Sequence, residues 1–110
     1  MATFELYRAP PSSGKKYKVI ISMYGARHSV MFGAAGYSDY TQHKDPARKQ
    51  RYIDRHRARE HWSSAGLYTA GFWSRWLLWN KPSLLASAHD IERRFGLRYV
   101  GLHDAHHERD

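Results

Sequence analysis

The chain has 110 residues, a formal net charge of +8 at neutral pH and no cysteine. An apolar fraction of 42% with 15% aromatic residues is typical of a folded domain, and the length suits one hydrophobic core. The missing thiols exclude a disulfide scaffold and a zinc site built on cysteine, while the excess of positive charge predicts a polyanionic partner.

The N-terminal sequence, MATFELYRAPPSSGKK, lacks the continuous apolar core of a signal peptide. No apolar run in the chain reaches the roughly 20 residues that a membrane-spanning helix needs. We therefore expect a protein that is not secreted and has no membrane partner. The Pro, Ser, Gly and Lys residues at 9–16 indicate a connector, and the first eight residues fit either a short strand or an arm. We assign residues 1–16 to an N-terminal arm and connector.

A β-hairpin is predicted over residues 17–34. In the first segment, YKVIISM, Val19, Ile21 and Met23 alternate with polar or opposite-facing side chains, as in a strand with one buried face. The sequence YGAR then turns the chain, because Gly25 tolerates the backbone angles of a tight turn. The following HSVMFGA is the returning strand.

Three helices are predicted after the hairpin. The first begins at Asp45, an N-cap residue followed by Pro46, and runs to about residue 63. The second covers about 70–79, and the third covers 83–96, where a serine caps its start and a glycine its end.

These elements predict a single small α+β domain, in which an N-terminal β-hairpin is followed by three helices. The compact domain spans residues 17–96. Residues 97–110 form a C-terminal tail, which begins with a short strand and becomes rich in histidine.

Four arginines of the first helix form what we call the arginine stripe. Their spacings of three, four and four residues place them within about 80° of one another on the helix surface. Arginine binds phosphate through two parallel hydrogen bonds, so such a row is a candidate nucleic-acid-binding surface. Together with a flanking lysine, the predicted nucleic-acid-binding residues are Arg48, Lys49, Arg51, Arg55 and Arg59.

The alternative interpretation of the arginine stripe is a solvated helix face. Asp54 would then pair with Arg51 or Arg57, and each pair would contribute a few tenths of a kcal/mol. The sequence leaves both interpretations open. It also leaves open whether the polyanionic partner is DNA, RNA or an acidic protein.

A second class of function depends on His43, Asp45, His56 and Glu60. Histidine and carboxylate ligands beside arginines are found in metal-dependent nucleases and other phosphoryl-transfer enzymes. However, no HExxH or HxxxH spacing occurs, and Asp45 already serves as a helix cap. We therefore favour structural roles for these four residues, and we predict no metal, no cofactor and no catalytic residue.

The segment TAGFWSRWLLWNKPSL, residues 69–84, places Trp73, Trp76 and Trp79 within seven positions. Because its helix would be apolar nearly all round, the core is the first interpretation. A partner interface formed by the three tryptophans and a base-stacking platform are the alternatives. We expect Trp76 to be the most buried of the three and Trp79 the more exposed.

Three stretches of the chain resemble a family of small uncharacterised proteins encoded by large double-stranded DNA viruses of algae and protists. These stretches are KKYKVII, VMFGAAGYSDYTQHKDPARKQRYIDRHRAREHW and TAGFWSRWLLWNKPSLLASAHDIERRFG, so that the resemblance runs from about Lys15 to Gly96. The resemblance implies a viral origin and a compact α+β domain. It supplies no activity and no catalytic residue.

The sequence therefore predicts a non-enzymatic viral structural or assembly protein. It would be a small virion component that contacts a larger viral structural protein through its tryptophans, a basic nucleic-acid-associated protein, or both. Self-association into a homo-oligomer is compatible with either role. We expect the protein in the virion or in the interior of the infected cell, and a small metal-dependent nuclease is the alternative.

Overall fold

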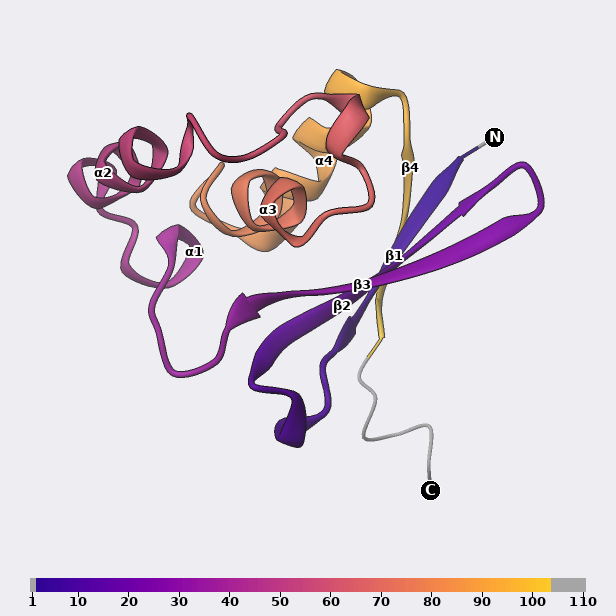
Figure 1. The fold of residues 1–110 in the computed structure, drawn as a ribbon, viewed down its shortest axis with the longest axis horizontal. Coiled ribbons are helices and arrows are strands. Elements are labelled where there is room, and N and C mark those ends of the chain that lie inside the picture. The colour runs from indigo at the N-terminus through magenta and orange to yellow at the C-terminus, as the bar shows by residue number, and fades with distance from the viewer. Residues whose placement is uncertain (1, 104–110) are drawn as a thin grey trace.

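A four-stranded sheet covered on one face by helices makes up the fold (Figure 1). The computed structural model describes residues 2–103. The strands are β1 (Thr3–Arg8), β2 (Lys15–Met23), β3 (Ala26–Ala34) and β4 (Arg98–His103). The helical segments are η1 (Pro11–Ser13), α1 (Tyr40–His43), α2 (Pro46–His56), η2 (Ser64–Gly66), α3 (Ala70–Trp73), η3 (Ser74–Leu78) and α4 (Leu84–Phe95).

Strands β2 and β3 form the predicted hairpin, which spans residues 15–34. The turn between them consists of Tyr24 and Gly25, whose φ angles are 53° and 80°. Positive φ at both central residues is characteristic of the tight type I′ turn, whose twist matches that of the flanking strands. The hairpin prediction is therefore confirmed, with slightly longer strands.

The N-terminal segment is a strand and not an arm. Strand β1 lies inside the sheet, whose order is β3-β2-β1-β4, and pairs antiparallel with β2 and parallel with β4. Phe4 and Leu6 point to the covered face and are completely buried. Strand β1 is an inner strand because it also pairs with β4, which lies about 95 residues later in the chain. No local pattern in the sequence indicates that pairing. Strand β4 is the short strand expected at residue 97 onward, and residues 104–110 of the predicted tail lie outside the described part.

Helix α2 begins as predicted and ends early. The carboxylate of Asp45 accepts a hydrogen bond from the backbone N–H of Ala47 (2.9 Å), so that it caps the helix. The helix ends at His56, about seven residues before the predicted end. The chain then folds back, and the carbonyl of Trp62 accepts a hydrogen bond from the indole N–H of Trp76 (2.8 Å). The predicted last turns of the helix are therefore a loop that contacts η3.

The tryptophan-rich segment is helical over the predicted range, but its second half is a π-helix. Thr69 caps α3, and the backbone N–H of Trp79 donates to the carbonyl of Ser74 five residues earlier (3.1 Å). Helix α4 begins after the predicted cap, Ser83, and ends at Phe95, just before the predicted Gly96, whose φ is 68°. The short helix α1, which begins after the capping residue Asp39, was not predicted.

The core lies between the covered face of the sheet and α3, η3 and α4. Trp73 is completely buried, packs against Phe4 (5.2 Å between ring centroids) and donates its indole N–H to the carbonyl of Leu67 (2.7 Å). Trp76 is 8% exposed, so the expectation that it would be the most buried tryptophan is wrong. Trp79 is half-buried, and it is the more exposed of the three as predicted. The chain is a single compact α+β domain, and in its described part no helix has the length and apolar character needed to cross a membrane.

Candidate nucleic-acid interface

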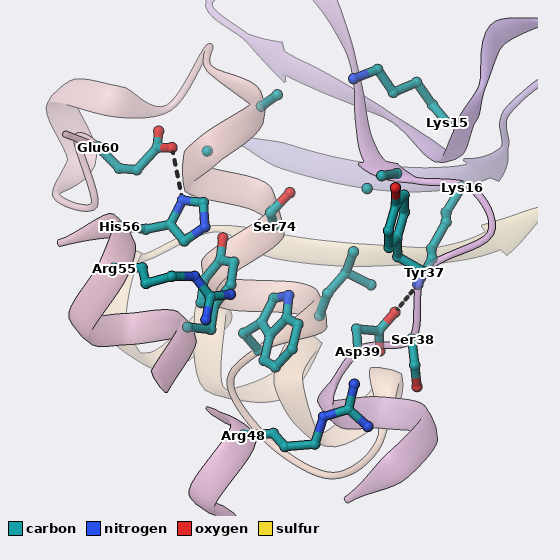
Figure 2. A pocket seen from close by; sticks show the side chains of 17 residues that line it. Lys15, Lys16, Tyr37, Ser38, Asp39, Arg48, Arg55, His56, Glu60 and Ser74 are labelled. Atoms are coloured by element: carbon teal, nitrogen blue, oxygen red, sulfur yellow. Dashed lines mark hydrogen bonds and ion pairs between the residues drawn. The ribbon is translucent and has the colours of Figure 1, made fainter. Parts of the chain in front are cut away.

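A cleft of about 470 Å³ lies between α2 and the end of the β2–β3 hairpin (Figure 2). We call it the α2 cleft. Helix α2 forms one wall, the start of β2 and the loop after β3 form the opposite wall, and α3 and η3 contribute to the floor. The cleft therefore brings together segments that are separated by more than fifty residues in the sequence.

The α2 wall carries Arg48 and Arg55. These residues are seven positions apart, which corresponds to about two turns and a rise of about 10 Å along the helix. Both side chains are exposed, and Figure 2 shows both guanidinium groups turned toward the cleft. Within residues 2–103, neither arginine has a hydrogen bond or an ion pair with another side chain. Their charges are therefore available to a ligand.

The opposite wall carries Lys15, Lys16, Tyr37 and Asp39. The Lys16 ammonium donates to the Asp39 carboxylate (2.5 Å) and to the side-chain oxygen of Gln42 (3.0 Å). Its positive charge is therefore paired with a negative charge of the protein. Lys15 is exposed, and its ammonium has no ion pair with a described residue. Tyr37 stands at the rim with 74% of its surface exposed.

The floor of the α2 cleft is aromatic. Tyr52 stacks on Trp79 with a centroid separation of 4.4 Å and an angle of 3° between the rings, and it also stacks on His56 (4.3 Å). Burial raises the pKa of the Tyr52 phenol to about 12, so it remains neutral. The floor thus consists of stacked rings from α2 and from Trp79, the residue after η3.

A glycine lets the hairpin approach this floor. Gly33 has a φ of 81°, and a Cβ atom added there would lie 2.8 Å from Cδ1 of Leu78 in η3. Both the backbone angle and the close approach therefore require glycine at this position. Without it, the wall that bears Lys15 and Tyr37 would lie farther from α2.

His56 and Glu60 form a pair at one end of the cleft, with 3.5 Å between Nδ1 and Oε2. The Glu60 carboxylate lies against Gly71 of α3, where an added Cβ would be 1.9 Å from Oε1. In total, four cationic side chains line the cleft and two carboxylates offset only part of their charge. The cations are Lys15, Lys16, Arg48 and Arg55, and the carboxylates are Asp39 and Glu60.

The other predicted nucleic-acid-binding residues lie elsewhere. Lys49 donates to the backbone carbonyl of Asn80 (2.7 Å) and lies over the ring of Tyr40 (5.0 Å), and burial lowers the pKa of its ammonium. Lys49 therefore does not line the α2 cleft, and its ammonium is held against the segment that follows η3. Arg51 is exposed on α2 but does not line the cleft, and Arg59 lies in the turn after the helix, so the arginine stripe is shorter than predicted.

The structure separates the four residues of the alternative catalytic set. His43 and Asp45 lie before the N-terminus of α2, where the ring Nδ1 of His43 accepts the backbone N–H of Asp45 (3.0 Å). His56 and Glu60 lie at its other end, about 16 Å away along an eleven-residue helix. Within residues 2–103, no three His, Asp or Glu side chains are grouped so as to hold a metal ion. The four residues of the alternative set therefore do not lie together, because two come from each end of a helix.

The three tryptophans also have different roles. The structure assigns Trp73 and Trp76 to the core rather than to a partner interface, since both are buried. Trp79 is part of the cleft floor. Lys15, Tyr37 and Tyr52 were not among the predicted site residues, although the tyrosine-rich loop YSDYTQHK and the pair KK at 15–16 were signals for the first two.

Comparison with known proteins gives one similarity. A family of unknown function, DUF5754, is similar to this chain over residues 6–56, which run from β1 to the last residue of α2. The similar region covers a little under half of the chain and includes both walls of the α2 cleft, but not the tryptophan-rich segment. No curated protein and no solved structure matches the sequence.

Proposed function

We propose that the protein is a non-enzymatic nucleic-acid-associated protein, which binds phosphates through Arg48, Arg55 and Lys15 of the α2 cleft. The observation that carries the proposal is the pair of exposed arginines without a protein partner, two helical turns apart on one wall. Arginine matches phosphate geometry with two parallel hydrogen bonds, and a separation of about 10 Å allows the two residues to bind different phosphates.

The chemistry of the cleft favours nucleic acid over an acidic protein. Beside its cations, the cleft holds the stacked rings of Tyr52 and Trp79 in its floor and the exposed ring of Tyr37 at its rim. Positive charge interleaved with aromatic rings is the usual composition of nucleic-acid-binding grooves. The net charge of +8 adds a long-range attraction for the same partner.

The resemblance to proteins of large DNA viruses suggests where this binding takes place. A basic protein of a virion, or of the infected-cell interior, would contact the viral genome through the α2 cleft and a larger viral structural protein through another surface. Mass spectrometry of purified virions tests this part of the proposal, and absence of the protein from particles would contradict a virion role.

The binding proposal is tested by the salt dependence of affinity. Each neutralised phosphate releases condensed counterions and adds about 0.7 to 0.9 to the slope of log affinity against log salt concentration. The double variant Arg48→Gln/Arg55→Gln should therefore lower the slope by about 1.4 to 1.8, as measured by fluorescence anisotropy with a labelled oligonucleotide between about 50 and 200 mM salt.

The matched control is Arg98→Gln, which removes one exposed arginine at the start of β4, on the opposite side of the molecule from α2 (Figure 1). Its slope should stay close to that of the parent protein. Weak binding that does not respond to salt would refute the proposal. It would also be refuted if Arg98→Gln lowered the salt slope as much as Arg48→Gln or Arg55→Gln alone.

A further inference from the structure

We infer that the α2 cleft binds an unpaired nucleotide within a single strand, and that the protein therefore prefers single-stranded to duplex nucleic acid. This inference rests on the proposed function and specifies the ligand of the same site. It follows from the shape of the cleft, from its exposed aromatic ring and from the separation of its cations.

The shape of the cleft disfavours a duplex. A helix that reads a duplex must project outward to enter the major groove, which is about 12 Å wide. Here Arg48 and Arg55 line a concave site instead, and the hairpin end with Lys15 and Tyr37 stands across from them (Figure 2). The cleft volume of about 470 Å³ is within the range of small-molecule sites, about 300 to 1,000 Å³. It therefore suits one nucleotide that has left the base stack.

The aromatic groups provide a place for the base. Tyr37 is 74% exposed on the wall opposite Arg55, and Trp79 is half-buried in the floor, where Tyr52 fixes its ring. An exposed ring beside a cationic wall is the arrangement on which unpaired bases stack, independently of their identity. A paired base inside a duplex presents no free face to such a ring.

Two hydroxyl groups complete the lining. Ser38 and Ser74 both line the cleft, and neither side chain has a hydrogen bond within the described residues. They are available to the sugar or to the polar edge of a base. The cleft thus holds cations for phosphate, a ring for the base and hydroxyls for the remaining polar groups.

The spacing of the cations favours a strand over a free mononucleotide. Arg48 and Arg55 are about 10 Å apart along α2, and Lys15 lies on the other wall. A single phosphate group contacts one of these positions at a time. A strand that passes through the cleft supplies a phosphate to each of them.

The experiment compares a labelled single-stranded oligonucleotide of 12 residues with a hairpin duplex that has the same number of phosphates, at one salt concentration. We expect the single strand to bind at least about tenfold more tightly. Tyr37→Ala should weaken single-strand binding about 5- to 100-fold, the range found for loss of one base-stacking ring, and should leave both the salt slope and duplex binding unchanged. Tyr37→Phe should retain the affinity.

Tyr24→Ala is the matched control, because Tyr24 is 98% exposed in the hairpin turn at the opposite end of β2 from Lys15. It should bind like the parent protein, and thermal melting should show that all variants are folded. Equal affinity for the two nucleic acids, with a slope that still depends on Arg48 and Arg55, would overturn this inference and leave the proposed function standing. Unchanged single-strand affinity of Tyr37→Ala would overturn it as well. Absence of binding to either nucleic acid would overturn both.

Discussion

Helices α2 and α4 both carry arginines close to an aspartate on the same helix, but the charges are used differently. In α4, Asp90 binds Arg93 (3.2 Å) and Arg94 (2.7 Å), and it also accepts a hydrogen bond from the side-chain amide of Asn80 (2.8 Å). Asp90 is 6% exposed. The Asn80 hydrogen bond ties α4 to the segment that follows η3, while the two arginines pair with Asp90 within α4.

In α2, the expected ion pairs are absent within the described residues. Asp54 accepts a hydrogen bond from the side-chain amide of Gln50 (2.9 Å) and, within residues 2–103, forms no ion pair with Arg51 or Arg57. Asp54 is exposed, as are the arginines around it. Exposed ion pairs gain too little to fix two long side chains in one geometry. In these two helices, the arginines that form ion pairs lie beside a buried carboxylate, although both helices have an arginine three residues from the aspartate.

The largest effect on stability is expected for Asp90→Asn. Burial alone would raise the pKa of Asp90, but hydrogen bonds from Asn80 and Arg94 hold it at about 2, below the ordinary value of 3.8. The charged form therefore contributes about 2 kcal/mol to folding at pH 7. Because the pKa is depressed in the folded state, this contribution is present above about pH 4 and is lost as the pH falls toward 2.

Urea denaturation at pH 7 and at pH 2 should show the difference. At pH 7 the Asp90→Asn variant should be less stable than the parent protein by about 2 kcal/mol. At pH 2 the difference in their free energies of unfolding should be smaller. Asp54→Asn is the control and should change stability by less than about 0.5 kcal/mol. Equal effects of the two substitutions would break the distinction between the two helices.

An intermediate effect is expected for Gly33→Ala, which tests whether core packing sets the shape of the α2 cleft. The φ of 81° and the close approach of Leu78 should make alanine cost about 1 to 2 kcal/mol. If the hairpin end moves away from α2, nucleic-acid affinity should fall along with the melting temperature. Gly14→Ala is a useful comparison, because its φ of 72° is similar but no neighbouring atom lies within 4 Å of the added Cβ. A loss of affinity in both variants would show that closeness to Leu78 is unimportant.

The smallest effect on stability is expected for Arg48→Gln/Arg55→Gln. Within residues 2–103, neither arginine side chain has a hydrogen bond or ion pair, so the free energy of unfolding should change by less than about 0.5 kcal/mol. Thermal melting of the double variant checks this. A loss as large as that of Asp90→Asn would show that the α2 arginines are structural and would remove the contrast between the helices.

Local signals in the sequence predicted those parts of the fold that depend on local chemistry. The starts of α2 and α4 follow from the caps Asp45 and Ser83, and the hairpin follows from alternation around Gly25. Tertiary contacts decided the rest. The loop after α2 is held by a hydrogen bond from Trp76 to the Trp62 carbonyl, a contact that no periodicity within α2 reveals.

The candidate site divides in the same way. Arg48 and Arg55 were predicted because helical spacing alone places them on one face. The contact of Lys49 with the Asn80 carbonyl could not be predicted in this way, because the two residues are 31 positions apart in the chain. Tyr37 reaches the cleft only after the hairpin has packed on η3, so its contribution to the site is a property of the fold.

The position of β1 in the sheet has a consequence for the time at which the fold can form. Thr3 of β1 pairs with Arg98 of β4. During translation, β1 can therefore pair with β4 only after about 95 more residues have been added. Until then, the edge of β1 that β4 will occupy is open. Closure of a loop this long is an entropic barrier, and non-local pairing of this kind slows folding. A nascent chain halted on the ribosome before β4 emerges would therefore hold a completed hairpin beside an exposed strand edge, the state most prone to pairing with other chains.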